Sequence, residues 1–87
     1  MRILELKQIV RKDVPIYYRR LFSATAVMEL LNKSSEYHVD FSIETKPTGH
    51  KEISITVTDP IDYPMLPVIK ELKQFVDKLD NNGGLPG

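Results

Sequence analysis

The sequence has no cysteine and no tryptophan, and charges of the two signs balance. The absence of cysteine excludes disulfide bonds, thiolate nucleophiles and cysteine-based zinc sites. Twelve Lys and Arg residues offset twelve Asp and Glu residues, which is far from the basic surplus of a dedicated nucleic-acid-binding protein. Apolar runs long enough to cross a membrane are also missing, and the N-terminal segment carries charges unlike a signal peptide. We therefore expect no membrane partner and a cytoplasmic location.

What the sequence does contain is enough apolar material for one folded domain. The chain has 87 residues, of which 41% are hydrophobic, an ordinary value for a globular protein. This length leaves no room for a second core. We predict one domain over residues 1–82, followed by a flexible C-terminal tail at residues 83–87, where two glycines precede Leu85.

The clearest pattern is an amphipathic helix near the C-terminus. Its apolar residues recur three and four positions apart, as one face of an α-helix requires. We expect Asp62 to cap the helix, Pro64 to lie in its first turn and Asn81–Gly84 to end it. The apolar face comprises Met65, Val68, Ile69, Leu72, Phe75, Val76 and Leu79.

Two alternating segments before this helix predict a β-hairpin. Residues 39–45 and 51–57 each place apolar and polar side chains in turn, and Pro47-Thr48-Gly49 between them suits a three-residue loop. The loop fixes a register in which all six apolar residues share one face. The expected pairs are Val39 with Val57, Phe41 with Ile55, and Ile43 with Ile53.

The N-terminal half is harder to interpret. Residues 2–10 alternate, and we predict a strand whose even-numbered residues face inward. Residues 16–31 fit either a strand with its even-numbered side inward or a helix beginning near Ser23. We favour the strand, with a bend or bulge near Ser23 to Thr25, and place the following turn at residues 32–35.

These elements predict an α+β fold. The expected architecture is an antiparallel β-meander of about four strands, with the C-terminal helix packed on one face in the order ββββα. The alternative order is ββαββα, with a short helix near residues 23–33.

The sequence offers little material for catalysis. His38 and Asp40 would point the same way from one strand, but we interpret them as part of a solvated hairpin face. Asp59 and Asp62 are best explained as a strand end and a helix cap, and no spacing typical of a metal site is present. We expect no catalytic residues, no metal, no cofactor and no enzymatic activity.

An interaction role has more support, because a single helix leaves the second face of the sheet uncovered. Exposed apolar surface commonly marks a protein contact, and self-association would enlarge a small core. We predict a protein-binding module, most simply a homodimer, that uses the sheet face or edge around residues 17–27. The candidate contact residues are Tyr17, Arg19, Leu21 and Val27.

The alternative is a nucleic-acid-binding accessory protein. Aromatic side chains beside arginines can stack on bases and neutralise phosphates. The candidate residues are Arg11, Lys12, Tyr17, Arg19 and Arg20.

Overall fold

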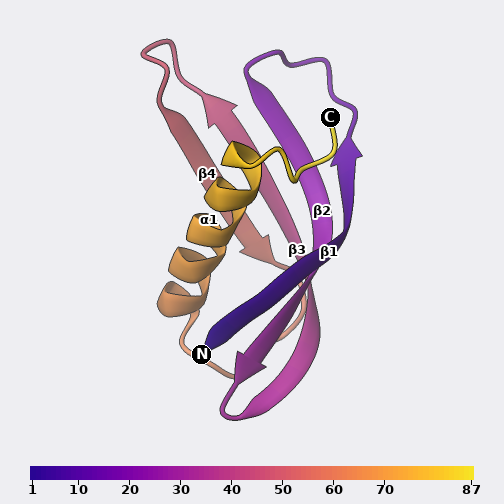
Figure 1. The fold of residues 1–87 in the computed structure, drawn as a ribbon, viewed down its shortest axis with the longest axis vertical. Helices are drawn as coiled ribbons and strands as arrows, with labels where there is room; N and C mark the ends of the chain where they lie inside the picture. Colours follow the sequence, from indigo (N-terminus) through magenta and orange to yellow (C-terminus); the bar gives the residue numbers. More distant parts are fainter.

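Four strands follow one another along the chain and pair in the same order, and one helix follows them (Figure 1). A computed structural model describes all 87 residues and confirms the predicted ββββα order. Every neighbouring pair of strands is antiparallel. The elements are β1 (Arg2–Lys12), β2 (Arg19–Leu30), β3 (Lys33–Thr45), β4 (Lys51–Val57) and α1 (Met65–Asn81).

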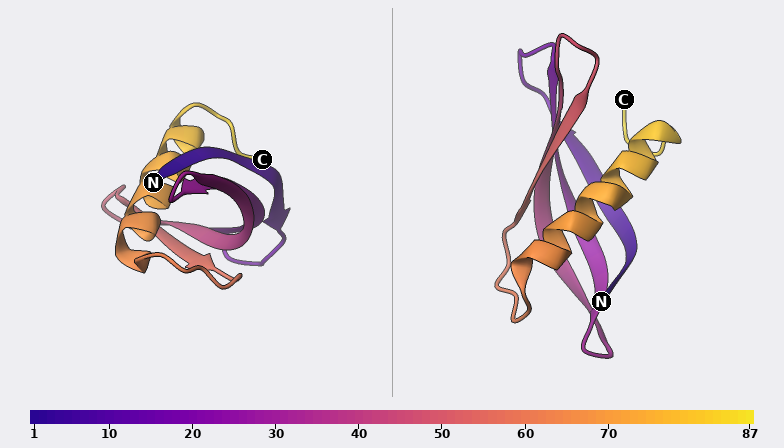
Figure 2. Two further views of the ribbon diagram at one scale, coloured as in Figure 1. Left: turned by 90° about the horizontal axis from the view of Figure 1, so that it is seen from below. Right: turned by 90° about the vertical axis from the view of Figure 1, so that its left-hand side faces the viewer.

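The sheet is strongly coiled, and α1 lies along its concave side (Figure 2). The helix contacts β4 and β1, the two outer strands, and so fills the gap between the sheet's edges. The core lies between the concave face and the helix. Its buried residues are Leu6, Phe22, Ala24, Ala26, Met28, Leu30, Val39, Phe41, Ile43, Val68, Leu72 and Val76.

Helix α1 presents the predicted face to the sheet. Val68, Leu72 and Val76 are fully buried, whereas Met65 is largely exposed at the first turn. The predicted cap at Asp62 is wrong, because the N-cap position is Pro64 and no side chain caps the helix. The C-terminal end matches the prediction, since the helix ends at Asn81 and Gly83 adopts a left-handed φ of 70°.

The β3–β4 hairpin has the predicted register. Val39 pairs with Val57, Phe41 with Ile55 and Ile43 with Ile53. The Lys46 amide donates to the His50 carbonyl at 2.8 Å, and Gly49 has a φ of 90° in the loop. A left-handed residue at this point is the reason for a glycine there.

Residues 19–30 form a strand, so the alternative helix near residues 23–33 is wrong. The even-numbered residues from Phe22 to Leu30 are buried, as predicted for the strand. The β2–β3 connection is shorter than predicted. Leu31 and Asn32 alone make the turn, and β3 already begins at Lys33, inside the predicted turn.

Strand β1 departs most from expectation. Its pairing with β2 shifts twice, between Ile3 and Glu5 and between Lys7 and Val10. Each shift adds a residue to β1 and reverses which side chains face inward. The even-numbered prediction is therefore wrong for Val10, which is 59% exposed, and Ile9 packs on the core instead. The irregularity expected near Ser23 to Thr25 lies in this ladder, but its extra residue belongs to β1.

The C-terminal tail returns toward β1 (Figure 1). The Gly84 amide donates to the Leu79 carbonyl at 2.7 Å, and Leu85 packs, partly buried, against the core. The mobility expected of residues 83–87 stays a prediction. No helix in the structure has both the length and the apolar character to cross a membrane.

Candidate protein-interaction surfaces

The convex side of the sheet, which α1 does not cover, is a mixed polar surface that we call the outer face. Alternation along each strand places small and hydroxyl-bearing side chains there, because the larger apolar residues face the helix. We define the outer face by the residues Lys12, Arg19, Leu21, Ser23, Thr25, Val27, His38, Asp40, Ser42, Glu44, Ser54 and Thr56.

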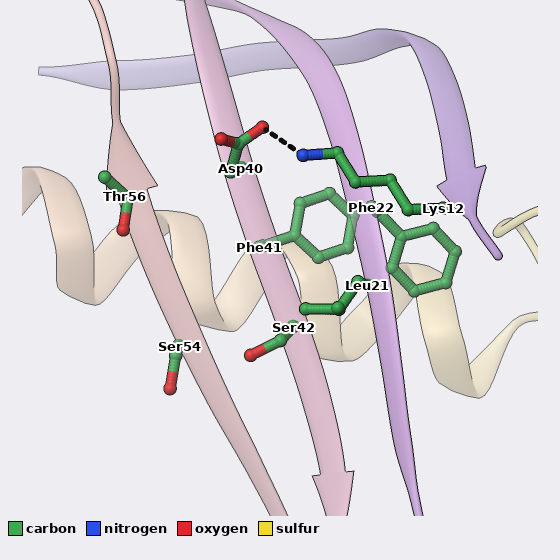
Figure 3. A pocket seen from close by; sticks show the side chains of 8 residues that line it. All are labelled: Lys12, Leu21, Phe22, Asp40, Phe41, Ser42, Ser54 and Thr56. Atoms are coloured by element: carbon green, nitrogen blue, oxygen red, sulfur yellow. Dashed lines mark ion pairs between the residues drawn. The ribbon is translucent and has the colours of Figure 1, made fainter. Parts of the chain in front are cut away.

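The outer face has one shallow hollow, over the middle of β2, β3 and β4 (Figure 3). Lys12 reaches across β2 toward Asp40, and its Nζ lies 3.6 Å from the Asp40 Oδ1. Leu21, Ser42 and Ser54 lie nearby. The hollow is open to solvent, and its ion pair is about half exposed at both ends. Such a site offers weak polar contacts and no activated nucleophile.

The four predicted contact residues do not form one continuous apolar patch. Tyr17 is fully exposed in the β1–β2 loop, whereas Leu21 and Val27 are half-buried on the outer face. Ser23 and Thr25 separate those two side chains along β2. Arg19 lies at the start of the strand, where its Nη2 donates to the Glu44 Oε1 at 2.7 Å. The same bond lowers the pKa of the Glu44 carboxyl below its usual value.

The structure separates the basic residues proposed for nucleic-acid binding. Arg19 and Arg20 point to opposite faces, and each is held by a carboxylate, Glu44 and Asp80 respectively. Lys12 faces Asp40. Arg11, at the edge strand, is exposed. Opposite charges therefore accompany most of this cluster, and it is not a continuous basic surface.

Arg20 instead joins the sheet to the end of α1. Its Nη1 and Nη2 donate to the two carboxylate oxygens of Asp80 at 2.8 and 3.0 Å. Lys51 of β4 also donates to Asp80 at 3.0 Å. The Asp80 side chain is only 14% exposed. The bidentate bond from Arg20, supported by Lys51, lowers the pKa of Asp80 from 3.8 to about 2.

The two histidines form no catalytic arrangement with Asp40. His38 does share a face with Asp40, but its Nδ1 lies 2.8 Å from the Asp59 Oδ2, and its ring is largely exposed. The His38 backbone amide donates to the same oxygen at 2.8 Å, which lowers the pKa of Asp59. Asp59 thus ties the start of the connector to β3. His50 is exposed in the β3–β4 loop.

A second surface, which the sequence did not predict, lies at the end where the β2–β3 turn projects (Figure 1). Leu31 at the turn is 78% exposed, and Leu66 in the first turn of α1 is 84% exposed. The signal was present in the sequence, because alternation on both sides of Leu31-Asn32 leaves only two residues for the turn. A leucine at such a position cannot enter the core. We call the β2–β3 turn with Leu31 the hairpin tip.

The fold and these surfaces define a small ββββα domain with a covered concave face, an uncovered outer face and no group of three or more metal-ligating side chains. The chain belongs to the BB_0187 family, whose model matches residues 1–81. That match spans all four strands and the helix. No curated protein and no solved structure matches the chain.

Proposed function

We propose that this protein is a non-enzymatic interaction module that associates with a second copy of itself. The observation that carries the proposal is the number of large apolar side chains left in solvent around a filled core. Such residues are typical of a contact surface when they gather at one place. The most exposed are Val10, Tyr17, Tyr18, Leu31 and Leu66.

The arrangement of the polar groups supports a binding role over a catalytic one. The hollow on the outer face is shallow, and its charged groups Lys12 and Asp40 are partly solvated. The most strongly shifted carboxylate, Asp80, is engaged by Arg20 and Lys51 and holds the helix in place. A cytoplasmic location, expected from the sequence, is part of the proposal, and cell fractionation tests it.

The surface proposed from the sequence is the sheet face around residues 17–27. Its support is the lack of any covering element and the presence of Tyr17, Leu21 and Val27. Arg19 of this group already has its charge balanced by Glu44, so it adds little to a contact with a second chain.

Light scattering after size-exclusion chromatography tests self-association over a range of protein concentrations. We expect the mean mass to rise from that of one chain toward that of two as concentration increases. A Leu21→Glu variant tests the outer face, with Thr48→Glu at the β3–β4 loop as a control of equal charge change. A single-chain mass at every concentration of the unaltered protein would remove the proposal.

A further inference from the structure

The hairpin tip holds a leucine in an unfavourable position. Leu31 has a φ of 51° and Asn32 a φ of 63°, and the flanking residues Leu30 and Lys33 pair with each other. Two central residues with positive φ define a type I′ turn, which favours Asn and Gly and disfavours a residue such as leucine. Leu31 is also 78% exposed. The monomer gains nothing from either feature, and such strain is commonly retained at binding sites.

A recess lies directly beside this leucine, between the turn and the connector that leads to α1. Leu30, which is buried, and Tyr37, which is half-buried, provide its apolar part. Lys33 and Asp62 also line the recess. Neither of these two side chains belongs to an ion pair within the chain.

We infer that the hairpin tip is the self-association site, and that two copies exchange Leu31 side chains across a two-fold axis. A projecting side chain next to a recess is self-complementary, because the two-fold axis brings each leucine to the other copy's recess. The same symmetry sets Lys33 of one copy against Asp62 of the other, so each unpaired charge gains an opposite one. The inference rests on the proposed self-association and assigns its contact away from residues 17–27.

The contact is small, so the dimer is expected to be weak and concentration-dependent. Interfaces at the low end of the size range belong to transient complexes. Sedimentation velocity over a wide concentration range is therefore the appropriate measurement.

The first test is Leu31→Asn. Asparagine suits a type I′ turn, so this variant should fold with a melting temperature equal to or above that of the unaltered protein. It removes the inserted side chain from both halves of the dimer. We expect the dissociation constant to rise about a hundredfold, the loss expected from two buried leucines. Tyr17→Asn, at the opposite end of the molecule, is the matched control and should leave the constant unchanged.

The second test exchanges the charges of the recess. Lys33→Asp and Asp62→Lys should each weaken self-association roughly tenfold, because each creates two like-charge contacts across the axis. An equimolar mixture of the two variants should form a heterodimer, since both contacts then join opposite charges. Native mass spectrometry distinguishes the heterodimer from either homodimer when one variant is isotopically labelled.

The results separate the inference from the proposal on which it rests. A monomeric unaltered protein would overturn both. A dimer that survives Leu31→Asn but is lost in Tyr17→Asn or Leu21→Glu would overturn the inference and leave self-association through residues 17–27. Failure of the mixed charge variants to associate would also count against the two-fold arrangement.

Discussion

At the residue scale, Asp80 has the most consequential environment in the chain. It accepts hydrogen bonds from Arg20 of β2 and Lys51 of β4, and so fastens the end of α1 to both sides of the sheet. The bond between Arg20 and Asp80 joins residues 60 positions apart. Alternation along β2 places Arg20 on the inward side, but only the folded helix reveals its partner. The sequence alone therefore suggests a free arginine where the structure has a bound one.

The pKa of Asp80 predicts a specific loss of stability in acid. The folded-state pKa is about 2 and the ordinary value is 3.8. A carboxyl whose pKa is lowered by folding stabilises the protein above its ordinary pKa. That stability is lost as the pH falls from about 4 toward 2. After allowance for solvent screening, the contribution is on the order of 1–2 kcal/mol.

The variant Asp80→Asn isolates this effect in urea unfolding curves measured across that pH range. It should be less stable than the unaltered protein near neutral pH, and the two should converge at the acid end. Asp13→Asn, at an exposed aspartate of the β1–β2 loop, is the control and should follow the unaltered protein. A constant difference between Asp80→Asn and the unaltered protein at all pH values would contradict the assignment.

At the element scale, the helix is the part of the molecule that its own periodicity predicts best. Leu72 is fully buried in the middle of α1, and Leu66 is 84% exposed in its first turn. We expect Leu72→Ala to lower the free energy of unfolding by about 2–5 kcal/mol, because it removes buried methyl groups and leaves a cavity. Leu66→Ala changes the same residue type on the same helix and should alter it by about 0.5 kcal/mol or less. Equal losses from both variants in chemical denaturation would contradict the packing described for α1.

The elements differ in how far the sequence predicts them. The β3–β4 hairpin was predicted with its register because uninterrupted alternation on both strands and a loop containing Gly49 leave one solution. Strand β1 was predicted as a strand but with the wrong side chains inward. Its bulge places Gln8 at a φ of 53° and reverses the alternation beyond it. Nothing in the residue types at positions 4 or 8 indicates a bulge, because the coiling of the whole sheet creates the need for it.

At the scale of the whole molecule, the coiled sheet explains why the two candidate surfaces differ. The helix fills the gap between β1 and β4, so apolar side chains from every strand converge on one core (Figure 2). The outer face is left with small and charged residues, many of them paired with each other. The ends of the molecule are less constrained, and the hairpin tip lies at one of them. The sequence predicted an uncovered face correctly, but which leucine is exposed at a turn depends on where that turn ends.

The distribution of charge over the folded chain also predicts its behaviour toward nucleic acids. The net charge is zero, and Lys12, Arg19 and Arg20 each face a carboxylate. Phosphate binding would have to displace those carboxylates, and little counterion release would remain to drive it. We therefore expect labelled single-stranded and duplex oligonucleotides to show no change in fluorescence anisotropy at low salt. Glu44→Gln, which frees Arg19 from its partner, should produce at most weak binding that added salt abolishes. Binding by the unaltered protein that persists at physiological salt would instead favour the nucleic-acid-binding alternative, with Arg11 and Tyr17 as the first residues to substitute.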